Sequence, residues 1–234
     1  MPAEDPIIAQ LRQCSVATIT HWLFGKGYHH AFMHGLTCLR EDLRLVGRAR
    51  TVRFVPVRPD LAELFPDREK NPHRKAVDHI GAGEVLVVDA HGSAAGGIFG
   101  DIMSARLEAR GAAGLVVDGG LRDVWQIKEL NLPTYVRHVH AAAVSRAVSA
   151  VEMDGIVSCA GVAVRPGDYL AGDPDGVVVI PAALAAEAVA HALPHDQLEV
   201  FIRERVRAGA PLRGNYPPTE AIRAEYERRQ THSD

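Results

Sequence analysis

Two short apolar runs, separated by a helical pattern, constrain the fold of this chain most. The first run is Glu84–Asp89 and the second is Gly114–Val117. Runs of this kind are typical of strands buried on both faces, as in the parallel sheets of α/β proteins. Between them, Asp101–Arg110 has apolar residues at helical spacing and is followed by Gly111, a common helix stop. The order strand, helix, strand predicts a βαβ unit at the centre of the chain.

The segments around this unit are of mixed type. Further strands are expected at Leu45–Val57, Leu132–Val136, Gly155–Pro166, Asp168–Leu170 and Gly176–Pro181. Helices are expected at Asp5–Cys14, Val16–Phe24, Arg74–Ile80, Ala182–Ala192, Gln197–Ala208 and Thr219–Arg229. Pro56–Asn71, with its prolines and mixed charge, reads as an irregular excursion. We therefore expect one α/β domain over residues 1–234, a three-layer β/β/α arrangement with its core at about 15–193 and a C-terminal helical arm at 194–234.

Composition excludes several classes of function. A formal net charge of -3 gives no general attraction to nucleic acid. The three cysteines include no CxxC pair, so we expect neither a disulfide framework nor a structural zinc site, and a reducing cytoplasm fits best. Met1–Gln10 lacks the basic and apolar regions of a signal peptide, and no run approaches the ~18 apolar residues of a membrane span.

The glycine-rich stretch before the central helix is the first candidate binding element. Gly96, Gly97 and Gly100 precede a helix that should begin near Asp101. Glycines let a backbone approach a ligand closely, and the free N–H groups at a helix start attract anions. This stretch therefore suits a carboxylate or a phosphate. The spacing is not GxGxxG, so a dinucleotide cofactor is not expected.

The second candidate element follows the second buried strand. Arg122 and Asp123 come after Asp118-Gly119-Gly120-Leu121, and ligands of open α/β sheets bind beyond the carboxyl ends of strands. An arginine can grip a carboxylate with two parallel hydrogen bonds, and an aspartate can hold Mg²⁺ while waters complete its coordination. An Arg–Asp pair that only stabilises a turn is the alternative interpretation.

Several pieces of the sequence together resemble one family. They are Gly100-Asp101, the stretch ARLEARGAAGLVVDGGLRD that ends at Asp123, and PGDYLAGDPDGVVVIP, which ends at Pro181. Their combination and spacing resemble the class II 4-hydroxy-4-methyl-2-oxoglutarate aldolases and RraA-like proteins, over most of Gly81–Pro181. The tail RAGAPLRGNYPP is similar to that of a longer branch of this family.

The resemblance implies a fold and a set of residue roles. The fold would be a swivelling-type RraA-like domain with helical N- and C-terminal extensions. Asp123 would bind Mg²⁺ or Mn²⁺, Arg122 would face the substrate, and Asp101 would position a water for proton transfer. The backbone at Gly100, Ile102 and Met103 would hold the substrate carboxylate. A glutamate from a neighbouring subunit, Glu199 or alternatively Glu204, would reach the metal through water in a homotrimer or a dimer of trimers.

The resemblance also implies a reaction. A 4-hydroxy-2-oxo acid would be cleaved to pyruvate and a second carbonyl compound, with the metal acting as a Lewis acid, and oxaloacetate decarboxylation would be a side activity. The alternative is a regulator without catalysis that binds an RNase, as RraA does. The three site residues Asp101, Arg122 and Asp123 favour catalysis.

Other chemistries have weaker support in the sequence. A Schiff-base aldolase needs a buried lysine, and Lys26, Lys70, Lys75 and Lys128 are the only lysines, in contexts that look polar or exposed. Ser93 and Cys159 lack the GxSxG context of a hydrolase nucleophile. Two groups of histidines are expected to be solvated or to pack rather than bind metal: His29, His30 and His34, and the pair His138 and His140.

Overall fold

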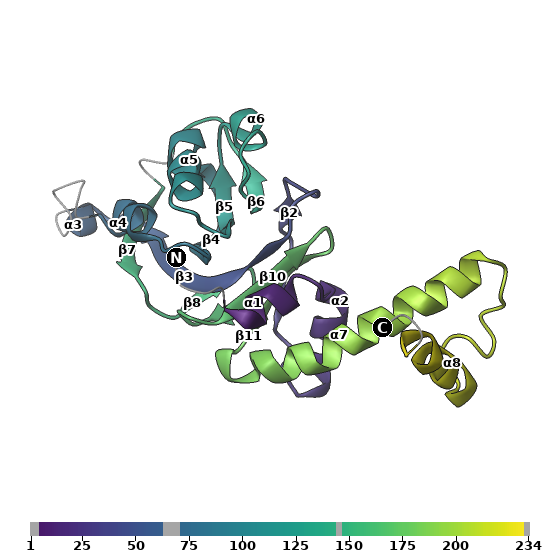
Figure 1. The fold of residues 1–234 in the computed structure, drawn as a ribbon. Coiled ribbons are helices and arrows are strands. Elements are labelled where there is room, and N and C mark those ends of the chain that lie inside the picture. The colour runs from purple at the N-terminus through teal and green to yellow at the C-terminus, as the bar shows by residue number, and fades with distance from the viewer. Residues whose placement is uncertain (1–4, 63–70, 144–146, 232–234) are drawn as a thin grey trace.

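The fold is built on one mixed β-sheet with the strand order β1-β11-β10-β3-β4-β5-β6-β2 (Figure 1). The structure is a computed structural model and describes residues 5–62, 71–143 and 147–231. Four central strands run parallel: β3 (Leu45–Pro56), β4 (Glu84–Phe99), β5 (Gly114–Leu121) and β6 (Thr134–Val139). The expected βαβ unit is therefore confirmed, with α5 (Asp101–Ala109) as its crossover helix.

Antiparallel strands flank the parallel ones. β10 (Tyr169–Asp173) pairs with the start of β3, followed by β11 (Gly176–Ile180) and β1 (Phe32–Met33). β2 (Thr37–Cys38) lies at the other edge, against β6. β7 (Val148–Met153) pairs with the far end of β3, and β8 (Val157–Cys159) and β9 (Val162–Val164) form a separate hairpin.

The central strands are covered on both faces, which explains their continuous apolar sequence. In β4, Leu86 and Val88 face a core shared with α4 (Pro72–His79), α5 and α6 (Val124–Ile127). Val85 and Val87 point the other way, to a core shared with the β8–β9 hairpin. The hairpin, the sheet and the helices thus form the expected three layers.

A third core lies over the antiparallel strands. It joins β10 and β11 to α1 (Pro6–Leu11), α2 (Val16–Gly25) and α7 (Ala185–Arg207), which continues from a 3-10 turn at Ala182–Leu184. Ser15 caps α2, as the sequence predicts: its Oγ accepts from the Thr18 N–H at 3.1 Å. α8 (Glu220–Gln230) packs on the far half of α7, which projects from the body of the molecule (Figure 1).

Two expectations about where elements end are wrong. β4 does not end at Asp89 but continues through the glycine-rich stretch to Phe99, with shifts of register against β5. The two helices expected at Ala182–Ala192 and Gln197–Ala208 are one helix of 23 residues with Pro194 inside it. Apolar residues buried before and after Pro194 keep this helix packed although the proline removes one backbone hydrogen bond.

The remaining segments add little to the layers. In the expected excursion, a short helix α3 (Pro59–Ala62) follows β3, and residues 63–70 lie outside the described part of the chain.

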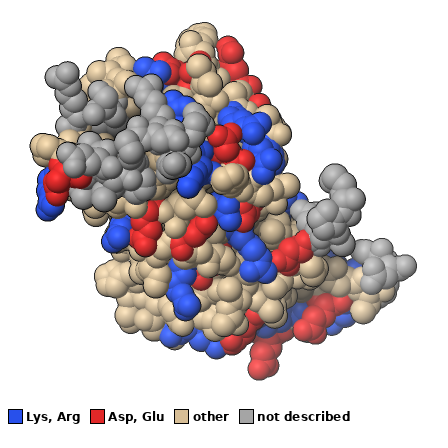
Figure 2. All heavy atoms as spheres, turned by 90° about the vertical axis from the view of Figure 1, so that its left-hand side faces the viewer, with Lys and Arg blue, Asp and Glu red and all other residues tan. Residues whose placement is uncertain are grey.

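Among the described residues, no helix combines the length and apolar character that crossing a membrane requires. Figure 2 shows basic and acidic side chains interspersed over the face that it presents, so opposite charges lie close together there.

The substitution Gly120→Ala tests the close approach of β4 to β5. A Cβ at this position would lie 2.1 Å from the Gly96 carbonyl oxygen, a backbone atom that cannot turn aside. Gly120→Ala should therefore lower the free energy of unfolding by roughly 1–3 kcal/mol, measured by urea denaturation. Gly25→Ala is the control: a Cβ there meets nothing within 4 Å, and alanine favours the helix. Equal stability of Gly120→Ala and wild type would contradict the described register.

Candidate active site

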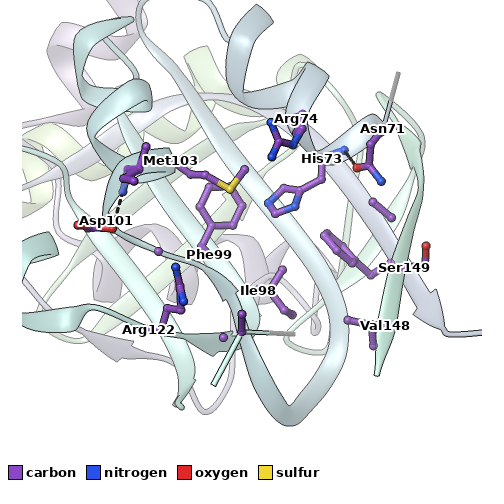
Figure 3. A pocket seen from close by; sticks show the side chains of 16 residues that line it. Asn71, His73, Arg74, Ile98, Phe99, Asp101, Met103, Arg122, Val148 and Ser149 are labelled. Carbon is purple, nitrogen blue, oxygen red and sulfur yellow. Dashed lines mark hydrogen bonds between the residues drawn. The ribbon is translucent and has the colours of Figure 1, made fainter. Parts of the chain in front are cut away.

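A cavity of about 480 Å³ opens where β4 and β5 end (Figure 3). Its walls come from the last residues of β4, the first turn of α5, Arg122 after β5, the first turn of α4, and β7. This is the carboxyl end of parallel strands, where open α/β sheets bind ligands. The predicted residues Gly100, Asp101, Ile102, Met103 and Arg122 all line it.

Asp123 adjoins this cavity in an unusual backbone conformation. Its φ is 58° and its ψ is 36°, the left-handed region that non-glycine residues seldom adopt, at a cost on the order of 1–3 kcal/mol. Its Oδ2 atom is buried and has no hydrogen-bond partner among the described residues. The Arg122 Nε atom lies 3.2 Å from that oxygen, in an ion pair that solvent partly reaches. The strain and the unsatisfied oxygen together mark Asp123 as a functional candidate.

Because residue 100 is a glycine, the start of α5 can lie close to Arg122 and Asp123. A Cβ at this position would lie 2.7 Å from Asp123 Oδ2 and 3.0 Å from Arg122 Nε. The Arg122 N–H also donates to the Phe99 carbonyl at 2.9 Å, which joins the end of β5 to the end of β4. The backbone at the start of α5 thus forms a cradle beside the carboxylate, and a larger residue at position 100 would fill it.

The donor set at this cradle suits a hard divalent cation. Mg²⁺ and Mn²⁺ prefer oxygen ligands, and Mg²⁺ commonly keeps several waters around one or two carboxylates. Asp123 offers a carboxylate oxygen that makes no hydrogen bond and has the Arg122 ion pair beside it. Within residues 5–62, 71–143 and 147–231, no three His, Cys, Asp or Glu side chains gather to form a metal site. A cation here would therefore depend on Asp123, water and substrate.

The Asp101 carboxylate already accepts a hydrogen bond from the first turn of α5. The Ile102 N–H donates to Asp101 Oδ1 at 2.8 Å, so this carboxylate occupies one of the two N–H groups expected to hold a substrate (Figure 3). A substrate carboxylate would share this turn with Asp101 or move it. The turn is therefore suited to an anion, and a substrate carboxylate could replace Asp101 at this N–H group.

Glu199 and Glu204 lie on α7, which packs on α1 and α2 rather than on the cavity. Glu199 Oε1 is 3.3 Å from His195 Nε2, one turn earlier on the same helix. The structure does not bring either glutamate to Asp123 within one chain. Their role in a neighbouring subunit's site stays a prediction.

The cavity wall formed by the start of α4 was not predicted from the sequence. Asn71, His73 and Arg74 line the cavity, because α4 begins at Pro72 rather than at Arg74. The signal was present: Asn71 is an N-cap residue whose Oδ1 accepts from the His73 N–H at 3.0 Å, and Pro72 suits the first helical position. Val148 and Ser149 of β7 complete this side (Figure 3).

His73 is half-buried, and its ring lies in an apolar setting. Its ring packs edge-to-face on Phe54 and Phe99, at centroid distances of 5.1 Å and 4.6 Å. Its Nε2 atom is buried and, like Asp123 Oδ2, has no hydrogen-bond partner among the described residues. Burial lowers the pKa of His73 from 6.5 to about 3, and nearby Arg74 adds to this effect. The imidazole is therefore neutral at any ordinary pH.

The alternative chemistries find no support at this cavity. No lysine is among the described residues that line it, and Lys26 pairs with Glu187 elsewhere; Lys70 lies outside the described residues. Cys159 is buried, and burial raises the pKa of its thiol well above the usual value, which makes it unreactive. His29 and His34 pack against Phe24 and Phe32.

Comparison with known proteins identifies the family to which this sequence is similar. The sequence profile of the RraA-like family, described as Aldolase/RraA, matches residues 16–179. A Halalkalibacterium halodurans protein named "Putative 4-hydroxy-4-methyl-2-oxoglutarate aldolase" is 39% identical over 143 residues, which are 61% of this chain and 62% of that protein. The match thus spans less than two thirds of this relative's length.

Two solved structures share the fold over most of their length. An uncharacterized protein from Pseudomonas syringae pv. tomato has a TM-score of 0.81 and 25% identity, covering 94% of this chain and 96% of its own. RraAS2 from Streptomyces coelicolor, described as an unusual member of the RNase ES inhibitor RraA protein family, has a TM-score of 0.76 and 32% identity. That match covers 87% of this chain and 98% of RraAS2.

The environment of His73 predicts a pH dependence of stability. The unfolded histidine binds a proton below about pH 6.5, whereas the folded one stays neutral down to about pH 3, so stability should fall as the pH decreases between these values. His73→Phe removes this contribution. Its melting temperature should fall less than that of wild type between about pH 7 and about pH 5. His79→Phe, at an exposed position of the same helix, is the control; parallel curves for all three proteins would contradict the burial of His73.

Proposed function

This chain belongs to the RraA-like family of aldolase and RraA proteins, and on that premise we propose that it is a divalent-metal-dependent aldolase. The proposed reaction cleaves a 4-hydroxy-2-oxo acid to pyruvate and a second carbonyl compound. The observation that carries this proposal is the Asp123 carboxylate: it is held in a strained conformation, one oxygen is buried without a hydrogen bond, and it lies beside Arg122.

Different residues of the chain bind different groups of the pyruvate half of the substrate. The first turn of α5, at Ile102 and Met103, presents N–H groups to the substrate carboxylate. Arg122, which lines the cavity, would face the 2-oxo oxygen and stabilise the negative charge that develops there when the C3–C4 bond breaks. A divalent cation held by Asp123 would act as a Lewis acid toward the same oxygen. Asp101 positions a water that delivers a proton to C3.

The same arrangement accounts for the proposed side activity. Loss of CO₂ from oxaloacetate leaves the same negative charge on a pyruvate unit as aldol cleavage does. Arg122 and the first turn of α5 would therefore serve both reactions, and oxaloacetate decarboxylase activity is part of the proposal. The preferred metal in this proposal is Mg²⁺ or Mn²⁺.

A homotrimer or a dimer of trimers is the proposed assembly. Ile102 and Trp125, at the starts of α5 and α6 beside the site, are both 78% exposed, and large exposed apolar side chains support a contact with another copy there. In such an assembly, Glu199 or Glu204 of a neighbouring subunit would reach the metal through water. No nucleic acid or membrane partner is proposed.

A regulator that binds an RNase is the second candidate. RraAS2, a member of the RNase ES inhibitor RraA protein family at 32% identity, favours it. Asp101, Arg122 and Asp123 favour the enzyme instead, because a binding surface has no need of a buried carboxylate oxygen that makes no hydrogen bond. Adding the purified chain to an RNase E-type cleavage assay separates the two: the enzyme proposal expects no inhibition.

Asp123→Asn tests the proposed metal ligand. Asparagine tolerates the left-handed conformation, so the fold should persist while the charge is lost. Wild type should release pyruvate from 4-hydroxy-2-oxo acids, measured with lactate dehydrogenase, in a reaction that EDTA abolishes and Mg²⁺ restores. The variant should lose at least about 100-fold in kcat.

The control variant is Asp78→Ala, which removes a half-exposed partner of Arg106 on the surface and should act like wild type. Normal turnover of Asp123→Asn would show that the site is misplaced. Trapping of pyruvate on the protein by borohydride would show a Schiff-base mechanism instead.

A further inference from the structure

The α4 wall of the cavity carries a histidine that the reaction described above leaves unused. Figure 3 shows Asp101 and Arg122 on one side of the cavity and His73, with Asn71 and Arg74, on the other. Phe99 lies between the two sides, and its ring touches the His73 ring. If Arg122 and α5 hold the pyruvate half, the departing half of the substrate extends toward α4.

His73 is held rigidly at this wall. Its backbone N–H is bound by Asn71 Oδ1 at 3.0 Å, and its ring is fixed between Phe54 and Phe99. A buried ring nitrogen without a hydrogen-bond partner destabilises the folded state. Folding alone therefore gives no reason for a histidine here, since a phenylalanine would pack against the same rings without that cost. A ligand that hydrogen-bonds the imidazole would supply the missing partner.

Aldol cleavage needs a group that accepts the proton of the C4 hydroxyl. The other polar groups on the described walls are poor choices. Arg74 is a cation, Asn71 and Ser149 carry neutral groups that are not basic, and Asp101 lies on the other side of the cavity, with Arg122. His73 is the base on the wall that the departing half would face. Burial lowers the pKa of His73 to about 3, so the imidazole is neutral and can accept a hydrogen bond from the C4 hydroxyl; to take up its proton, the pKa must rise when substrate binds.

We propose that His73 is a catalytic residue that accepts the C4 hydroxyl proton during cleavage, an inference that rests on the proposed aldolase function. The O–H bond breaks and its electron pair forms the C4=O double bond. The C3–C4 bond breaks, and its pair passes to the pyruvate half. A water-borne proton then adds to C3, and the imidazolium of His73 returns its proton to water, so protons and electrons balance.

Decarboxylation of oxaloacetate has no C4 hydroxyl, and this difference gives the test. His73→Phe should lower kcat/KM for the 4-hydroxy-2-oxo acid that wild type cleaves best by at least about 100-fold. Its kcat/KM for oxaloacetate with Mg²⁺ should stay within about threefold of wild type. His73→Gln, which retains a hydrogen-bond acceptor but not a base, should lose cleavage nearly as much as His73→Phe. His79→Phe is the matched control on the same helix, and thermal melting should show His73→Phe at least as stable as wild type near neutral pH.

Each other outcome overturns a specific claim. Equal losses in both reactions would make His73 a structural residue, and unchanged cleavage would remove it from the reaction; either result overturns the inference alone. A wild type that neither cleaves 4-hydroxy-2-oxo acids nor decarboxylates oxaloacetate would overturn the proposed function, and the role of His73 with it.

Discussion

The close approach of two strand ends is the constraint on which the rest of this site depends. β4 and β5 converge so tightly that a Cβ at Gly97 would lie 2.7 Å from the Arg122 Cβ atom. Side chains are absent at Gly97, Gly100 and Gly120, and the backbone fills the space instead. As a result, an arginine, a carboxylate and a helix start lie within one cavity. The buried sheet beneath, covered on both faces, supplies the rigidity that holds the strained Asp123.

The electrostatics of the cavity follow from unequal burial. The Arg122–Asp123 pair is partly open to solvent, where an ion pair contributes little to stability, so both groups remain available to ligands. The His73 ring packs on two aromatic rings with its Nε2 atom buried, and this burial keeps it neutral. The cavity thus combines a cation, an anion and a neutral base, and each has a distinct use in breaking a carbon–carbon bond next to a carbonyl.

The sequence predicted those parts of this arrangement that rest on local pattern. The apolar runs at Glu84–Asp89 and Gly114–Val117 specify strands buried on both faces, and the Arg122-Asp123 pair after the second run points to a strand-end site. The extension of β4 through its glycines was not predictable, because that stretch has no side-chain periodicity and only pairing with β5 makes it a strand. His73 was missed because its place depends on the packing of α4 against Phe54 and Phe99.

Binding of oxalate, a planar analogue of the charged pyruvate unit, tests the central claim that Gly100–Met103 and Arg122–Asp123 form one metal-dependent site. Calorimetric titration of the full chain should show oxalate binding only when Mg²⁺ is present. Gly100→Ala should abolish that binding, because its Cβ would lie 2.7 Å from Asp123 Oδ2. Oxalate that binds equally well without Mg²⁺, or equally well to Gly100→Ala, would contradict the account.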